Sequence, residues 1–443
     1  MLGVPRARRT VRVAGAVVAA AVTVCAIFAT TSSGHSATAA SACGTETTFV
    51  DYICGKAGSA NPKLAPALIG WSNDQGGTIV SIGPEATSAA QFAVNWINKY
   101  GGGIDGHPVK LAVCLIKNSE EEGLACGDEF LANKNIHVIS YGATSTGGQT
   151  IDSTVAGKVP LVEGFATNQS DSTNKNSYIL YTATPFGYYG FGTFAKQVLH
   201  AKTAAILYPQ GTGFQENAAA TQTSMQAEGI TSKLVGYNVT TTNLEGALTA
   251  AGAQNAGVVA LTGATPANCV ALDKGLVTLG VSPDKVVSDF DCSVSSEKSS
   301  YGGDLPHWYF GEAQSGDSLT DDAVGAQYRK ALAEFGDSAD VSDVWYSGMF
   351  GTIMTIAQFM NRIGYTQLSN ATIAAKAKAF KGPLLLGEPH PFCGKYPNAP
   401  ALCGGGDHFF HYLGNGKFAA IGAWDDVPCD LQKRLHAKSP CTT

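Results

Sequence analysis

Apolar and polar residues alternate from residue 64 to residue 180 in a pattern typical of short buried strands separated by helices. Ala67–Gly70 is a run of the buried-strand type, and Glu85–Tyr100 has apolar side chains at helical spacing. Three consecutive glycines, Gly101–Gly103, end this predicted helix. Strand–helix repetition of this kind predicts a parallel sheet with helices on both faces. The series continues with strands over 109–115, 136–140 and 160–162 and helices over 121–133 and 148–156.

A second series of the same kind begins near Thr182. Two such series predict an α/β fold with two lobes, each built on a doubly wound parallel sheet. Further along, a long helix is predicted over 343–363, and Asn415-Gly416 lies between two apolar runs as in a β-hairpin. The elements of the second series are strands over 204–208, 232–237, 257–261 and 286–289 and helices over 189–200, 216–228, 244–251 and 268–279.

One short motif occurs in both series. A predicted strand leads into Gly142-Ala143-Thr144 in the first series and into Gly263-Ala264-Thr265 in the second, and a predicted helix follows each. Such turns lie at the carboxyl ends of parallel strands, where open α/β sheets bind ligands. Small residues there let backbone N–H groups and a helix N-terminus approach an anion. The alternative is a chance similarity of two strand–turn–helix units.

The first 42 residues have the three parts of a secretory signal peptide, namely four arginines, an apolar run over 13–29 and small residues that end at Ala42. An uncleaved membrane anchor is one alternative. A lipid anchor on Cys43 is another, although the leucine-like residue usual three positions before such a cysteine is missing. No later stretch approaches the length of a membrane span. We therefore expect a mature protein that is secreted or associated with the cell envelope, outside the cytoplasmic membrane.

The mature chain is acidic. Removal of residues 1–42 removes four arginines and no acid, so the formal net charge falls from −6 to −10. An acidic surface repels nucleic acid, and nucleic-acid binding is not expected. About 400 residues remain, which is more than one hydrophobic core usually serves. The length therefore agrees with two lobes.

Ten of the eleven cysteines follow Cys25, which lies in the signal segment. An even number of cysteines in an exported chain indicates disulfide bonds, and lipidation of Cys43 would leave one cysteine over. Zinc binding is the alternative, but no C-x-x-C motif occurs. The spacing favours five local pairs while leaving other pairings open: Cys43–Cys54, Cys114–Cys126, Cys269–Cys292, Cys393–Cys403 and Cys429–Cys441.

Motifs of catalysis are weak or absent in the sequence. There is no G-x-S-x-G nucleophile elbow and no P-loop. Gly190–Ala195 matches a relaxed dinucleotide-binding pattern, but it does not closely follow a strand, and the aromatic residues around it suit a packed helix start. His408 and His411 would point to opposite faces of a strand, so they could not share a metal ion. We expect no enzyme activity, no cofactor and no metal site.

The segment Asn95–Leu111 reads N-W-I-N-K-Y-G-G-G-I-D-G-H-P-V-K-L. It resembles the N-x-x-G-G-I-x-G signature of type I periplasmic binding proteins of the leucine/isoleucine/valine-binding family. Cys114 and Cys126 likewise resemble the disulfide that some members carry between the second strand and the next helix. The resemblance extends over Leu64–Trp424, nearly the whole mature chain.

The resemblance implies two lobes that are joined by three crossovers and close on a ligand between them. Lobe one would combine residues 60–182 with residues 312–380. Lobe two would combine residues 183–311 with residues 381–430. Residues 431–443 would form a C-terminal tail.

The family binds the carboxylate of an amino acid through first-lobe N–H and hydroxyl groups. The resemblance places these groups on two strand ends, which are Thr144, Ser145 and Thr146 and then Phe165, Ala166 and Thr167.

The amine would be bound by Asp291, whose alternative is a solvated loop acid beside Cys292. The family's tyrosine position falls near Phe214, where no tyrosine stands. Trp71 is a candidate apolar wall, with core packing as its alternative. The missing tyrosine weakens the expectation of a leucine-like ligand.

The resemblance therefore implies a substrate-binding component that captures a small amino-acid-like or amide molecule for the membrane permease of an ABC importer. We expect it to be a monomer. The alternative function is a ligand-sensing domain of the same fold that signals occupancy to a receptor. A sensor would normally continue into a membrane span, and no span follows in this sequence. Amino acids, short amides, urea-like compounds and aromatic acids all remain open as ligands.

Overall fold

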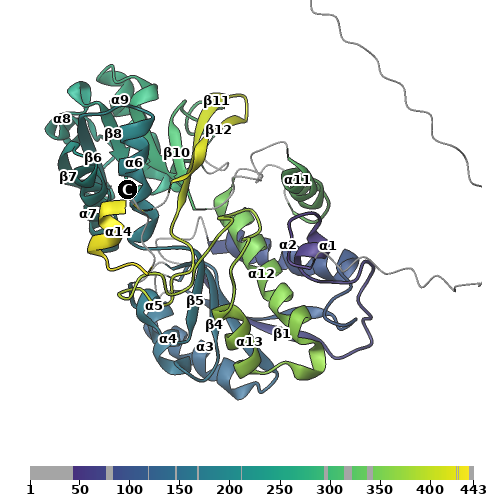
Figure 1. Cartoon of the computed structure of the whole chain (residues 1–443). Helices are drawn as coiled ribbons and strands as arrows, with labels where there is room; N and C mark the ends of the chain where they lie inside the picture. Colours follow the sequence, from purple (N-terminus) through teal and green to yellow (C-terminus); the bar gives the residue numbers. More distant parts are fainter. Residues whose placement is uncertain are drawn as a thin grey trace, which may run out of the picture. The chain divides into compact units, whose positions relative to one another are not determined.

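The computed structural model describes most of the chain after residue 42 (Figure 1). The predicted signal segment, Ser145, Thr146, Thr167 and Cys441 lie outside the described residues. The described residues are 43–75, 83–117, 119–144, 147–166, 169–210, 212–293, 298–313, 322–336, 343–425, 427 and 429–438.

The first of two sheets has the strand order β2-β1-β3-β4-β5, and all its strands pair in parallel. Apart from the edge strand β2, its strands are buried over most of their length, as their apolar sequences predict. The strands are β1 (Ala67–Asp74), β2 (Val109–Ile116), β3 (Ile136–Tyr141), β4 (Leu161–Ala166) and β5 (Ser177–Ala183). The helices that connect them are α2 (Gly83–Tyr100), α3 (Glu120–Ala132), α4 (Gly148–Val155) and α5 (Gln169–Thr173).

Helix α12 (Val344–Ile363) comes from far along the chain and packs against α2 and β4. It carries no charged residue before Arg362, and its residues are buried from Val344 to Met360. Figure 1 shows this green helix beside the purple α2. The first lobe is therefore completed by a segment that follows the second series. The other helices outside the two series are α1 (Phe49–Tyr52), α11 (Ala323–Phe335), α13 (Asn370–Lys378) and α14 (Cys429–Arg434).

The second sheet has the order β12-β11-β10-β9-β8-β6-β7. Strands β6 to β10 pair in parallel, and the hairpin β11–β12 adds an antiparallel edge. Asn415 and Gly416 form the hairpin turn with φ of +55° and +72°, which confirms the predicted hairpin. The strands are β6 (Thr203–Pro209), β7 (Thr231–Tyr237), β8 (Val258–Leu261), β9 (Val286–Asp289), β10 (Tyr309–Glu312), β11 (Asp407–Gly414) and β12 (Lys417–Asp425).

The helices of the second lobe complete the same architecture. The α-helices are α6 (Gly190–Gln197), α7 (Thr212–Ala227), α8 (Glu245–Ala251) and α9 (Pro266–Thr278). The short 3₁₀ helices are η2 (Phe186–Tyr188), η3 (Ala253–Asn255), η4 (Pro283–Lys285) and η5 (Phe290–Ser293), with η8 (Tyr365–Gln367) after α12.

The five parallel strands of the second sheet repeat the order of the first. Strands β7, β6, β8, β9 and β10 take the places of β2, β1, β3, β4 and β5. The two Gly-Ala-Thr turns follow β3 and β8, which are equivalent strands. The likeness of the two motifs is therefore part of a structural repeat and not a chance similarity.

Four disulfide bonds are present among the described residues, and they are four of the five expected pairs. The fifth pair includes Cys441, which lies outside the described residues. Among the described helices, none is long and apolar enough to cross a membrane. The four bonds are Cys43–Cys54, Cys114–Cys126, Cys269–Cys292 and Cys393–Cys403.

After α13 the chain runs along the edge of the first sheet before it enters the second. Ile179 in β5 donates its N–H to Ala401 O at 2.9 Å and accepts the N–H of Cys403 at 2.8 Å. The Tyr181 hydroxyl donates to Leu385 O at 2.7 Å. Residues between 385 and 403 therefore pack on the first sheet, whereas the predicted boundary assigns them to lobe two. The lobe boundaries stay a prediction.

Candidate functional site

Asp289, the last residue of β9, is held in place from two other segments. The Tyr188 hydroxyl in η2 donates to Asp289 Oδ2 at 2.8 Å, and the Gly263 N–H donates to the same oxygen. Asp289 is buried, and its Oδ1 has no hydrogen-bond partner among the described residues. Burial raises the pKa of Asp289 to about 6, and the bonds from Tyr188 and Gly263 limit the rise.

The turn after β8 needs a glycine at its first position. Gly263 has φ +65°, a left-handed conformation that favours glycine. A Cβ atom at Gly263 would also lie 2.7 Å from Cδ1 of Phe214, so α7 approaches the turn closely. The structure thus brings predicted Phe214 beside the predicted Gly-Ala-Thr turn, next to Asp289.

Asp291 lies two residues beyond the end of β9, in η5. Its Oδ1 is shielded from solvent and has no hydrogen-bond partner in the described part of the chain, which differs from a solvated loop acid. Burial and then the charge of Asp289 raise the pKa of Asp291 well above its usual value, and the charge of Asp343 adds to the rise. The neighbouring Trp345 indole opposes that rise, although its Nε1 forms no hydrogen bond with good geometry.

Asp343 is electrostatically linked to Asp291, and a fourth acid, Glu312, is linked to Asp343. Asp343 caps α12, where its Oδ1 accepts the N–H groups of Trp345 and Tyr346 at 2.9 and 3.2 Å. Glu312, the last residue of β10, is buried, and neither carboxyl oxygen has a hydrogen-bond partner among the described residues. Burial and then the charge of Asp343 raise the pKa of Glu312 well above its usual value. We call Asp289, Asp291, Glu312 and Asp343 the strand-end acid cluster.

Aromatic rings from both sheets meet beside this cluster. Phe165, near the end of β4 in the first sheet, has its ring centroid 6.1 Å from that of Phe290 in the second lobe. Trp345 is 5.2 Å from Phe165 and 6.0 Å from Phe290, in both cases edge to face. Phe290 directly precedes Asp291. Predicted residues Phe165 and Asp291 are therefore brought close together through Phe290 and Trp345.

The strand ends of the first sheet are fixed by a backbone network. Ala143 donates its N–H to Asn73 Oδ1 at 2.8 Å and accepts the Asp74 N–H at 2.7 Å. Thr144 lies in the turn after β3, Ala166 is the last residue of β4, and both are buried. The other three predicted first-lobe residues lie outside the described part of the chain.

Trp71 in β1 is fully buried in the hydrophobic core that also contains Phe165 and Trp345. Its Nε1 donates to Thr87 Oγ1 at 3.1 Å, so its polar atom is already bonded within the lobe. This placement agrees with core packing, the alternative reading of Trp71. Its contact with a solute stays a prediction.

Sequence reasoning did not identify four residues of this site as functional. Asp289 and Glu312 are the last residues of strands. The only sequence signal for either was that Asp289 is an acid at the end of the short run Val286–Asp289. Asp343 appeared only as the start of a predicted helix. Tyr188 lies 101 residues before Asp289, and no local pattern predicts such a contact.

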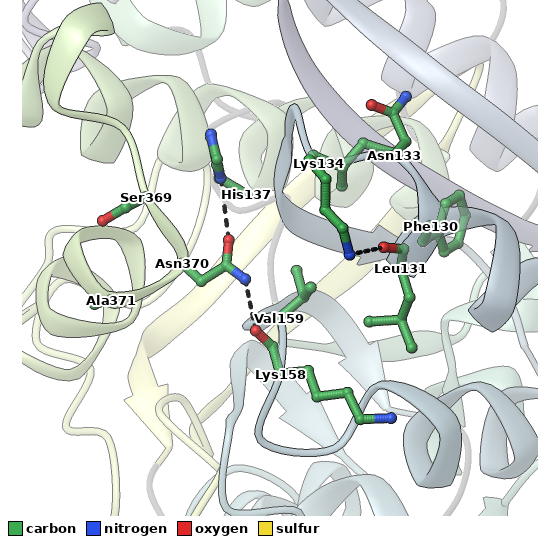
Figure 2. Close-up of a pocket in the computed structure, with 11 residues that line it drawn as sticks. Phe130, Leu131, Asn133, Lys134, His137, Lys158, Val159, Ser369, Asn370 and Ala371 are labelled. Atoms are coloured by element: carbon green, nitrogen blue, oxygen red, sulfur yellow. Dashed lines mark hydrogen bonds between the residues drawn. The ribbon is translucent and has the colours of Figure 1, made fainter.

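A separate pocket of about 670 Å³ lies at the opposite end of the first sheet (Figure 2). Ile136 and His137 begin β3, and Lys158 lies just before β4. Asn370 of α13 bridges them, since His137 Nδ1 lies 3.0 Å from its Oδ1 and its Nδ2 donates to Lys158 O at 2.6 Å. Because ligands of open α/β sheets bind at the carboxyl ends of strands, this amino-end pocket is not our candidate site.

The chain is similar to known proteins of one kind. Residues 66–392 match the family model described as periplasmic binding protein. A leucine binding protein from Thermotoga maritima superposes with a TM-score of 0.66 at 14% identity, covering 82% of this chain and 99% of that chain. No curated protein sequence gives a significant match.

Two further solved structures have the same fold. A branched-chain amino acid transporter substrate-binding protein from Streptococcus pneumoniae, in complex with isoleucine, has a TM-score of 0.64 at 15% identity, with 81% and 99% of the two chains covered. A fatty acid ABC transporter substrate-binding protein from Thermomonospora curvata has a TM-score of 0.66 at 11% identity, with 86% and 96% covered. Proteins of this fold thus include binders of chemically different solutes.

Proposed function

This chain belongs to the periplasmic binding protein family, and we propose that it captures a small amino-acid-like solute outside the cytoplasmic membrane for the permease of an ABC importer. Its role is binding and not catalysis. The observation that carries the proposal is the strand-end acid cluster, which lies beside aromatic rings from both sheets. Open α/β sheets bind ligands at this edge. We also propose that the N-terminal segment directs export of the protein and that the protein acts as a monomer.

In the proposed site, the solute lies between groups of the two lobes. The turns at 144–146 and 165–167 of the first lobe bind a carboxylate or amide oxygen. Asp291 of the second lobe binds an amine, and Phe214 and Trp71 contribute apolar surface. Asp291 suits the role because its Oδ1 is shielded from solvent and lacks a hydrogen-bond partner among the described residues. A charged donor would complete it with a charge-assisted bond.

The proposed lobes follow the predicted boundaries, with residues 60–182 and 312–380 in lobe one and residues 183–311 and 381–430 in lobe two. The stretch between 385 and 403 contacts the edge of the first sheet and forms part of the last crossover in this proposal. The packing of α12 on β4 supports a return to lobe one after the second series. The hairpin β11–β12 supports a second return to lobe two. Three crossovers of this kind allow hinge closure around a solute.

A thermal-shift screen of the purified chain tests the proposed function. The compounds are amino acids, short amides, urea-like compounds and aromatic acids. A solute that binds only the folded state at about 100 times its Kd should raise the unfolding free energy by about 2.7 kcal/mol. Calorimetry then confirms one site per chain. If no small solute of any class stabilises the protein, the proposed solute-binding role is wrong.

A further inference from the structure

When its acids are ionised, the strand-end acid cluster holds more negative charge than one ammonium group can balance. Glu312 is 1% exposed, and neither of its carboxyl oxygens has a hydrogen-bond partner among the described residues. The Oδ1 atoms of Asp289 and Asp291 are shielded and lack partners in the same way. Within the described part of the chain, no Lys, Arg or His forms an ion pair with these three acids. A buried carboxylate without a partner is costly, so each of these acids must either hold a proton or be balanced by a positive charge.

The segments outside the described residues cannot supply that charge. Every Lys, Arg and His after residue 42 belongs to the described residues, so the remaining segments of the mature chain contain none. These segments instead contain further acids, among them Glu297, Asp317 and Asp340. A positive charge that balances the ionised cluster must therefore come from outside the chain.

Two nearby groups of the protein fall short of balancing the cluster. His408 lies opposite Glu312 in the β10–β11 pair. Burial lowers the pKa of His408, so its ring is neutral at neutral pH. The N-terminus of α12 lies at Asp343 and offers about half a positive charge at most. The other acids of the cluster are left uncompensated.

From the acids without partners and the aromatic rings beside them, we infer that the solute is an organic cation with two or more amine or guanidine groups. This inference rests on the proposed function and names the class of its solute. Phe165, Phe290 and Trp345 add ring faces and edges beside Asp291, and such rings attract organic cations. No three acidic, histidine or cysteine side chains converge at metal distance among the described residues. We therefore favour an extended organic cation over a metal ion.

The test compares amines with neutral amino acids on the purified chain. The amine probes are putrescine, spermidine, agmatine and lysine, and the comparison probes are leucine, glutamine and glutarate. At least one amine probe should raise Tm and bind at one site by calorimetry, more tightly than leucine. Absence of binding by every amine probe overturns the inference. If leucine or glutamine binds in the same experiment, the proposed solute-binding function still stands.

A matched pair of variants locates the effect. Glu312→Gln removes one charge from the cluster and should weaken the bound amine about 30-fold, as for loss of one partner of a buried charge pair. Glu163→Gln alters an equally buried glutamate of β4, away from the strand end, and should leave the affinity unchanged.

Glu312→Gln should also raise Tm of the ligand-free protein, because it relieves repulsion from Asp343 and the cost of burying a charge. This second readout shows that the variant folds. Unchanged amine affinity in a folded Glu312→Gln protein overturns the inference, as does an equal loss of affinity in Glu163→Gln.

Discussion

The protein contains two groups of buried acids that lie in different parts of the fold. Asp289 and Glu312 are the last residues of β9 and β10 and belong to the strand-end acid cluster. The second group consists of Glu163 within β4 and Asp152 of α4, whose charge acts on Glu163, and we call it the mid-strand acid group after Glu163. Burial raises the pKa of both members of this group, as it does in the cluster. Burial and a raised pKa therefore do not distinguish a binding site from a structural one.

The distinction is clearest for Glu312, because Asp152, Glu163 and Asp289 each accept a hydroxyl at one carboxyl oxygen and have no partner for the other among the described residues. In the mid-strand acid group each acid accepts a hydroxyl of its own lobe, since Tyr141 donates to Asp152 at 3.1 Å and Ser177 donates to Glu163. Glu312 accepts no hydrogen bond among the described residues. An acid within a strand is enclosed by its own lobe, whereas an acid at a strand end can meet a solute. The predictions below test this contrast between the two groups.

The largest expected effect is on affinity and comes from Asp291. Asp291→Ala should weaken an amine solute by about 2–5 kcal/mol, because one partner of a buried charge pair is lost. An amide or urea-like solute has no ammonium, so the same change should matter less. Calorimetry with the solute found by screening measures the loss. An amine that binds the variant as tightly as the original protein would show that the site is misassigned.

The matched variant in the mid-strand acid group is Asp152→Ala. It leaves the buried Tyr141 hydroxyl without its acceptor, so the free energy of unfolding should fall by about 1–3 kcal/mol. Affinity for the solute should not change. A loss of affinity with intact stability would erase the contrast between the two groups.

Two disulfide bonds offer the next comparison. Cys269–Cys292 ties α9 to η5 directly beside Asp291, and Cys114–Cys126 ties β2 to α3. Replacing both cysteines of either bond by serine should lower stability by about 2–4 kcal/mol. Only loss of Cys269–Cys292 should also weaken solute binding, because η5 positions Asp291. Urea unfolding and calorimetry on the two double variants check this, and equal affinity in both would contradict it.

A pH dependence follows from Asp289, whose pKa burial raises to about 6. The folded protein then holds this proton more tightly than the unfolded chain, whose aspartates titrate near pH 4. The contribution to stability is thus full below about pH 4 and is lost as the pH rises through about 6, amounting to up to about 3 kcal/mol. The groups that face Asp289 are Tyr188, Tyr237, the Gly263 N–H, Ser288 and Asp291, and none of them is basic.

Unfolding of the ligand-free protein between pH 4 and pH 7 measures this effect. Asp289→Asn should make the fall in unfolding free energy with rising pH less steep. Asp128→Asn, on the exposed face of α3, should leave that fall unchanged. Binding of a cationic solute should show the opposite trend and weaken below about pH 6, because protons then compete for the cluster. If the unfolding free energy of Asp289→Asn falls with pH as steeply as that of the original protein, Asp289 is not the source of the pH dependence.

The sequence predicted most of the fold because its strands and helices have clear periodicity. The two α/β series, α12 and the hairpin at Asn415-Gly416 are confirmed. Strands β5 and β10 were missed. Tyr309–Glu312 has only four residues and includes a glycine and an acid, so its pairing with β9 and β11 defines it as a strand.

The site was less predictable because its contacts join distant segments. Asp291 and Phe165 followed from the family resemblance and stay proposals as ligand contacts. Tyr188 and Asp343 gain their meaning only from the fold, which places Tyr188 against Asp289 and Asp343 near Glu312. Local patterns carry no information about such neighbours, so sequence reasoning of this kind finds one acid where the structure has four.

The smallest expected effects come from two tyrosines, each of which donates a hydroxyl to an acid. Tyr141 donates to Asp152 in the mid-strand acid group, and Tyr188 donates to Asp289 in the strand-end acid cluster. Tyr141→Phe should lower the free energy of unfolding by about 1 kcal/mol, the usual net value of one hydrogen bond, and leave solute affinity unchanged.

Tyr188→Phe should instead weaken the binding of a cationic solute. Without the phenol, the ionised form of Asp289 is less favoured, so its pKa rises further and a cationic solute must displace a more tightly held proton. Affinity at pH 6 should therefore fall about tenfold at most, and the loss should shrink by pH 8, where Asp289 is ionised in both proteins. Calorimetry at the two pH values separates this from a general loss of packing, which would lower affinity equally at both.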